Sequence, residues 1–179
     1  GAEKNTYEPK WDAEGTTAKQ GNYTFAEGNL GELKIVEAEY SLTATDGGGV
    51  YKAEPYGISV AAPADASVSY YADAEMTQPA ENALTDVGTK TVYYKVVRPN
   101  YKDVTGSQVI TVTPATLTVT TDGQTWTYDG SEHSNAGNFV DGLVGGEKLV
   151  VENTGKVGPG VGAEKNTYEP KWDAEGTTA

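Results

Sequence analysis

The sequence contains no cysteine among its 179 residues, which excludes a disulfide framework and a thiolate metal site. It has no apolar run near the ~20 residues that a membrane-spanning helix needs. It also lacks the 3.6-residue apolar period of an amphipathic helix, so we expect almost no helix. A single histidine, His133, leaves little scope for proton transfer by imidazole near neutral pH.

Positive charge is scarce as well. The chain has 13 basic and 26 acidic residues, which gives a formal charge of -13. Such a surface repels the phosphates of nucleic acids and of anionic membranes, so we expect neither as a partner. The same charge favours a well-hydrated, soluble surface.

What the chain does contain favours β-structure. Its 22 glycines and many threonine, valine and tyrosine residues are typical of strands joined by tight turns. Alternation of polar and apolar residues predicts strands in seven stretches: 32–35, 41–45, 56–61, 67–71, 91–97, 107–113 and 117–120. The run Asp46-Gly47-Gly48-Gly49 is predicted to break the chain after the second of these.

The alternation also predicts which side chains face a core. In the strand over 32–35, Leu33 and Ile35 are expected to point inward. Between residues 37 and 115, one core is expected from the inward members of the other strands: Leu42, Ala44, Val92, Tyr94, Val96, Ile110 and Val112.

The first eighteen residues return without one change as residues 162–179, 161 positions later. Two copies of any age would have accumulated differences. The chain is therefore interpreted as a stretch of a tandem array with a 161-residue period, slightly longer than one period.

A weaker repeat divides this period into two related modules. The dipeptide Asn22-Tyr23 matches Asn100-Tyr101, and the strand that follows each of them has a similar pattern. The predicted organisation is a complete module over 37–115, the closing half of a split module over 1–36, and the opening half of the next over 116–179. We expect each half to be completed head to tail, by an identical chain or by the neighbouring repeat of the same array.

Several of these residues resemble the short Ig-like repeats called MBG or YDG domains, which fill the stalks of large bacterial surface and secreted proteins. The resemblance lies in Tyr128-Asp129-Gly130, in residues 86–94, and in Pro99-Asn100-Tyr101 followed by residues 109–115. In the complete module, Lys52-Ala53 replaces the Asp-Gly that follows the family tyrosine. The resemblance implies an all-β fold of tandem Ig-like β-sandwich modules on a bacterial cell surface or in a secreted protein, without catalytic residues.

No group of residues predicts catalysis. His133 lies in Ser131-Glu132-His133-Ser134 beside a turn, which is typical of a solvated loop. The spacing Gly158-x-Gly160-x-Gly162 precedes no helix that could hold a phosphate. We expect no enzyme activity, no cofactor and no metal, although turn aspartates leave a structural Ca²⁺ open and buried lysine and asparagine leave an isopeptide bond open.

Tyrosine and tryptophan are the candidates for a ligand-facing surface. Trp11 and Tyr93 lie among polar neighbours and are the best candidates for exposure. Tyr23 and Tyr101 are instead expected to close the end of a sandwich from a loop.

The favoured function is that of a stalk or spacer segment in a large extracellular, adhesin-like bacterial protein. One alternative is a module that binds a glycan or a mucus protein. A second alternative is a filament that assembles when split modules of different chains complete each other.

Overall fold

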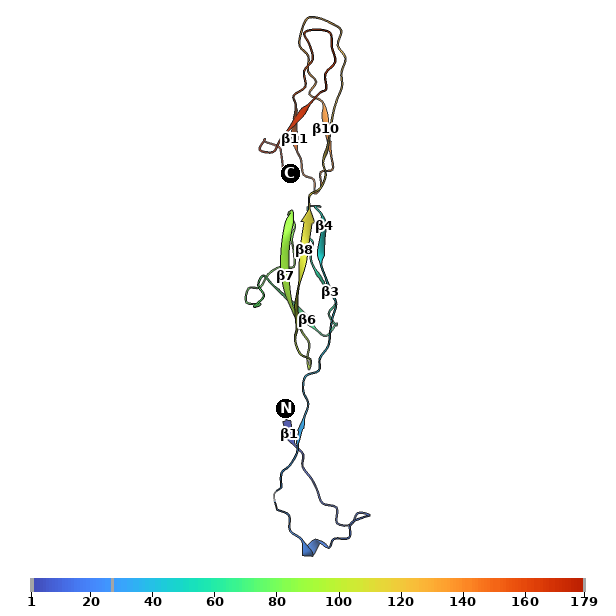
Figure 1. Cartoon of the computed structure of the whole chain (residues 1–179), viewed down its shortest axis with the longest axis vertical. Helices are drawn as coiled ribbons and strands as arrows, with labels where there is room; N and C mark the ends of the chain where they lie inside the picture. The colour runs from blue at the N-terminus through green and yellow to red at the C-terminus, as the bar shows by residue number, and fades with distance from the viewer. Residues whose placement is uncertain (1, 27, 179) are drawn as a thin grey trace.

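The computed structural model describes residues 2–26 and 28–178, and these residues are almost entirely β-strand and loop. A 3₁₀ turn at Gln20–Asn22 is the one helical element among them. The chain is elongated, and three segments follow one another along its long axis, with the N-terminal segment at one end and the C-terminal segment at the other (Figure 1). None of the described residues forms a helix long and apolar enough to cross a membrane.

A β-sandwich occupies the middle of the molecule, and we call residues 37–115 the central sandwich. Its larger sheet has the order β4-β8-β7-β6, formed by Gly47–Val50, Val104–Thr113, Gly88–Val97 and Ser67–Tyr71. Its smaller sheet pairs β3 (Ala44–Thr45) with β5 (Ser59–Val60). Strands β6, β7 and β8 pair antiparallel, whereas β4 runs parallel to β8.

The core lies between these two sheets and confirms the predicted strand faces. Its buried members are Ile58, Val92, Tyr94, Val96, Ile110 and Val112. Leu42 and Ala44, also predicted, are half-buried and pack against this cluster. Ile58, which directly precedes β5, was not among the predicted core residues.

The prediction of a break at Gly47-Gly48-Gly49 is wrong, because these glycines form β4. A Cβ atom on Gly47 would lie 2.1 Å from the carbonyl oxygen of Gly57, and one on Gly48 would lie 1.9 Å from that of Thr111. Only glycine leaves room for the backbone to approach this closely. The glycine run is therefore a strand inserted in a narrow space.

The N-terminal segment is a two-stranded ribbon without a second layer. Strand β1 (Ala2–Lys4) pairs antiparallel with β2 (Glu32–Lys34). Leu33 is 59% exposed and Ile35 is 89% exposed, so the prediction that they face a core is wrong within this chain. Tyr23 is 63% exposed and closes no sandwich. These side chains are exposed because no second sheet covers the ribbon in the described part of the chain.

The C-terminal segment contains two further ribbons. Strand β9 (Thr118–Thr121) pairs with β10 (Asn138–Asp141). Strand β11 (Val150–Asn153) pairs with β12 (Tyr168–Lys171). Neither β9 nor any neighbouring residue pairs with β2, so the segment carrying β2 does not fold back onto this end of the chain.

The two identical eighteen-residue copies adopt different pairings. In the first copy the strand is β1, whereas the corresponding residues 163–165 are in no strand. In the second copy the strand is β12, whereas the corresponding residues 7–10 are in no strand. Both copies share one turn, in which the amide of Thr16 or Thr177 donates to the carbonyl of Ala13 or Ala174 at 3.0 Å. The turn is therefore determined by its own local sequence, whereas the strands are determined by which partner strand lies beside each copy.

The glycine run supplies a first test. We expect Gly48→Ala to destabilise the central sandwich by about 2 kcal/mol more than Gly88→Ala, because the new methyl group would overlap Thr111. Gly88 is the matched control, since both glycines have positive φ but a Cβ on Gly88 meets nothing within 4 Å. Chemical denaturation measures both variants, and equal losses of stability would contradict the packing role of Gly48.

Candidate functional site

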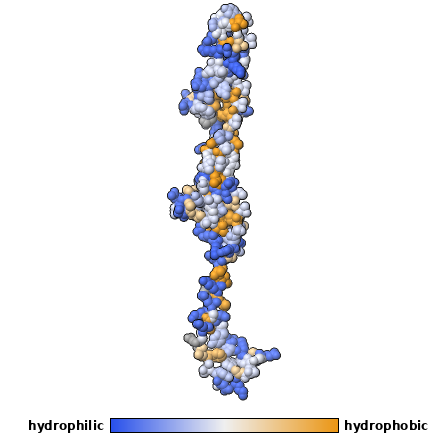
Figure 2. Space-filling view, in the orientation of Figure 1, coloured by the Kyte–Doolittle hydropathy of each residue, from blue (hydrophilic) through white to orange (hydrophobic). Residues whose placement is uncertain are grey.

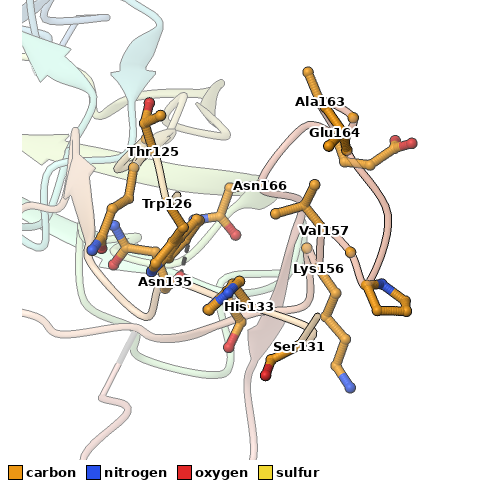
Figure 3. A pocket seen from close by; sticks show the side chains of 18 of the residues that line it. Thr125, Trp126, Ser131, His133, Asn135, Lys156, Val157, Ala163, Glu164 and Asn166 are labelled. Carbon is orange, nitrogen blue, oxygen red and sulfur yellow. Dashed lines mark hydrogen bonds between the residues drawn. The ribbon is translucent and has the colours of Figure 1, made fainter. Parts of the chain in front are cut away.

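A groove with a volume of about 400 Å³ opens in the C-terminal segment. Residues 122–129 line one side of it and residues 155–166 line the other. Figure 3 shows Trp126, Asn135 and His133 at its inner side, with Ala163 and Glu164 on the opposite arm of the chain. The backbone on both sides lies outside every strand of the described structure, at 123–126 and at 162–165.

His133 and Trp126 stack at one end of this groove. Their ring centroids are 4.9 Å apart and the ring planes are nearly parallel, at 11°. The backbone of His133 pairs with that of Val157, and its Nε2 lies 3.0 Å from Oδ1 of Asp129. Ser131, Glu132 and Ser134 are exposed, as predicted for a solvated loop, whereas stacking and pairing leave the side chain of His133 half-buried at 23% exposure.

Asp129 organises the turn that carries His133. Its carboxylate accepts a hydrogen bond from the backbone amide of Ser131 at 2.9 Å in addition to the contact with His133. Two hydrogen bonds hold the pKa of Asp129 below its ordinary value of 3.8: the larger effect comes from the Ser131 amide, and a smaller one comes from His133. The charged form of Asp129 is thus the form that supports the turn.

Asparagine side chains connect the segments that surround the groove. The amide nitrogen of Asn166 donates to the backbone carbonyls of Asp122 and Asn135, each at 3.0 Å. Asn153 donates to the carbonyls of Asn135 and Gly137, each at 2.8 Å. The side-chain oxygen of Asn166 is buried without a hydrogen-bond partner within the described structure. An unpaired buried acceptor costs free energy at this position.

Apolar groups lie at the open edges of the groove. Val161 is 93% exposed and Tyr128 is 70% exposed, although both line it. Residues 2–26 and 28–178 hold no cluster of three or more histidine or carboxylate groups that could bind a metal ion. They also bury no charged side chain, which the isopeptide alternative would require. The combination of unpaired backbone and apolar margins suits the binding of an extended peptide.

The two residues predicted to face a ligand lie elsewhere and are not brought together. Trp11 is half-buried, with its ring centroid 5.7 Å from that of Phe25 in the N-terminal segment. Tyr93 is half-buried on β7, beside Tyr71 of β6. Both are less exposed than their polar neighbours in the sequence suggest, and neither lines the groove.

No protein-family model matches this chain, and no curated protein matches it.

The residues of the groove were not identified from the sequence, although one signal marks them. Asp122-Gly123 repeats Asp46-Gly47, the dipeptide that leads into β4. In the central sandwich, β4 pairs with the inner strand β8. The residues after Asp122-Gly123 have no such partner in the described chain, and this difference from β4 marks the groove.

The Asp129 turn supplies a second test. A depressed pKa in the folded state gives a contribution to stability that is present above the unfolded value near 3.8 and is lost as pH falls through the folded value. We expect carboxyl NMR to show that Asp129 titrates below 3.8, with the resonances of the Ser131 amide moving in the same step. Titration of Asp129 at or above 3.8 would show that the two hydrogen bonds are absent in solution.

Proposed function

We propose that this chain is a stalk segment of a large extracellular repeat protein, in which successive β-units hold a distal part away from a surface. The elongated arrangement of the three segments supports this role (Figure 1). So does the exact repeat of residues 1–18 after 161 positions, because an array of such repeats gains length with each copy.

The observation that carries the proposal is the short, bridged connection after the central sandwich. Strand β8 ends at Thr113 and β9 begins at Thr118, so few residues separate them. Across this connection, the hydroxyl of Tyr51 donates to the carboxylate of Glu147 at 2.5 Å. That hydrogen bond is the first cause that raises the pKa of Tyr51. A short connection with a contact across it restricts bending, which a spacer needs.

The surface of the central sandwich also supports a spacer. Its large exposed apolar side chains are Val50, Val87 and Val97 within the described residues, and none of them is aromatic. Figure 2 shows hydrophilic residues interspersed with apolar ones over this part of the molecule. Single exposed valines are ordinary on a protein surface and form no binding patch. The high acidic charge keeps neighbouring stalks from adhering to one another.

The resemblance of Tyr128-Asp129-Gly130 and of residues 86–94 to MBG or YDG repeats agrees with the same role. The proposed location is accordingly the bacterial cell surface or the secreted space.

The stalk role is tested by measuring how the length of the molecule grows with the number of repeats. Chains with one, two and three 161-residue periods should increase in maximum dimension by a constant increment in small-angle X-ray scattering. A flexible string would instead grow roughly as the square root of the number of repeats. Sub-linear growth of the maximum dimension would therefore reject the stalk.

The connection supplies a further prediction. Inserting about six Gly/Ser residues between Pro114 and Ala115 should broaden the distribution of angles between the central sandwich and the C-terminal segment, since such linkers behave as flexible coil. Tyr51→Phe should broaden it less, because only the contact with Glu147 is lost. Scattering measured on both variants against the parent chain provides the comparison, and no broadening after the insertion would mean that the connection is already flexible.

A further inference from the structure

The groove in the C-terminal segment corresponds to the position of β8 in the central sandwich. The pairing of β11 with β12 repeats that of β6 with β7 in the same register. Val150 lies opposite Lys171 as Ser67 lies opposite Val97. Extending this correspondence toward the N-terminus aligns Gly162 with Gly88, so residues 163–165 occupy the place where β7 would meet β8.

The other side of the groove follows the same correspondence. Strand β4 starts one residue after Asp46, and the matching residues after Asp122 are 123–126. In the central sandwich, β8 lies between β4 and β7. In the C-terminal segment, the groove lies between 123–126 and 162–166. The groove is therefore the space of one missing strand.

The strand with the matching sequence is at the other end of the chain. In the ribbon of β1 and β2, Ala2 lies opposite Lys34 and Glu3 opposite Leu33. These pairs have the same register as Thr89 with Thr111 and Lys90 with Ile110 in β7 and β8. Gly31–Val36 is thus the counterpart of the C-terminal part of β8.

The burial of these counterparts differs sharply. Ile110 and Val112 are 0% and 2% exposed in the central sandwich. Their counterparts Leu33 and Ile35 are 59% and 89% exposed. The sequence retains apolar residues at two alternate positions that are wholly buried when the neighbouring strand and the second sheet are present. Exposed apolar residues in this pattern indicate a surface that another sheet covers.

We propose that the groove binds the strand Gly31–Val36 of a second copy of this chain, which runs antiparallel to residues 163–165 and parallel to residues 123–126. The ribbon of β1 and β2 and the C-terminal segment lie on opposite sides of the central sandwich along the long axis (Figure 1), so the strand comes from another copy of the sequence rather than from residues 31–36 of the same copy. The contact joins unlike surfaces, so it continues head to tail instead of closing as a dimer. The contact goes beyond the stalk role because it assigns the joint between successive copies, and the association measured below tests this joint without testing the stalk.

The identity of residues 1–18 and 162–179 determines the register of the bound strand and lowers the free-energy cost of exchanging one pairing for the other. Residues 163–165 repeat Ala2-Glu3-Lys4, so Ala163 takes the place of Ala2 opposite Lys34, and Lys165 lies opposite Glu32. The amide of Asn5 donates to the carbonyl of Gly31 at 2.7 Å, and Asn166 is the same residue in the second copy. The bound strand thus exchanges its pairing with β1 for pairing with the identical residues 163–165. It also pairs along its other edge with residues 123–126, and Leu33 and Ile35 become covered by the second copy.

The first experiment measures association of the 179-residue chain by sedimentation velocity in 0.15 M salt, where screening within about 8 Å limits repulsion between acidic copies. We expect a series of oligomers that grows with concentration. A chain in which residues 19–36 are repeated directly after Ala179 carries its own strand for the groove, and it should stay monomeric. A monomeric parent chain, or oligomers of the extended chain equal to those of the parent, would overturn the proposal.

A matched pair of substitutions tests the face of the strand. Ile35→Asp should weaken association at least about tenfold, because it places a charge at the position of buried Val112. Val36→Asp makes the same chemical change one residue later, at the position of exposed Thr113, and should alter association by no more than about threefold. Both residues are exposed in the free chain, so neither change should unfold it. Equal effects of the two substitutions would overturn the assigned face.

The register is tested by cross-linking, since the chain has no cysteine of its own. Leu33→Cys with Glu164→Cys places two thiols at directly opposite positions of neighbouring copies, within reach of a disulfide. With an added mild oxidant, we expect a ladder of covalent oligomers on a non-reducing gel. The control Lys34→Cys with Glu164→Cys is out of register and should give much less of it. Equal ladders from the two variants would overturn the register.

Discussion

Strand β8 forms backbone hydrogen bonds with β7 along one edge and with β4 along the other, while Ile110 and Val112 on it are wholly buried. The parallel approach of β4 requires a nearly bare backbone, which the glycines at 47–49 supply. Both the larger sheet and the core of the central sandwich therefore depend on this one strand. Where its counterpart is absent, as between residues 123–126 and 162–166, the flanking segments form no strand.

The two copies of residues 1–18 separate local from long-range causes of structure. The turn that contains Gly15 in one copy and Gly176 in the other has the same backbone hydrogen bond and a positive φ in both. Strand formation in the two copies differs, because a strand needs a partner and each copy has a different partner beside it. Different parts of the same eighteen residues thus form strands: Ala2–Lys4 beside β2 in the first copy, and Tyr168–Lys171 beside β11 in the second.

The sequence patterns predicted the long strands well for a physical reason. Residues 91–97 and 107–113 are half-buried between solvent and core, so polar and apolar side chains alternate, and the predicted buried face of β7 is confirmed. Alternation of polar and apolar side chains cannot be detected in a run of glycines, so the glycines of β4 were predicted to break the chain. It also cannot reveal whether a second layer exists, and for this reason Leu33 and Ile35 were expected to be covered. The groove was missed because it is defined by a strand that the local sequence does not contain.

The parallel direction of β4 and β8 has a consequence for a chain under tension. The polypeptide enters the central sandwich near Ala38, beside Tyr101, and leaves it after Thr113 at the opposite end (Figure 1). A pull on the two ends draws β4 and β8 in opposite directions along their own length. The four residue pairs from Gly47–Ile110 to Val50–Thr113 are then sheared together instead of being opened one after another. Separation of β4 from β8 requires these pairs to break at the same time. The arrangement therefore resists force along the axis on which the three segments follow one another.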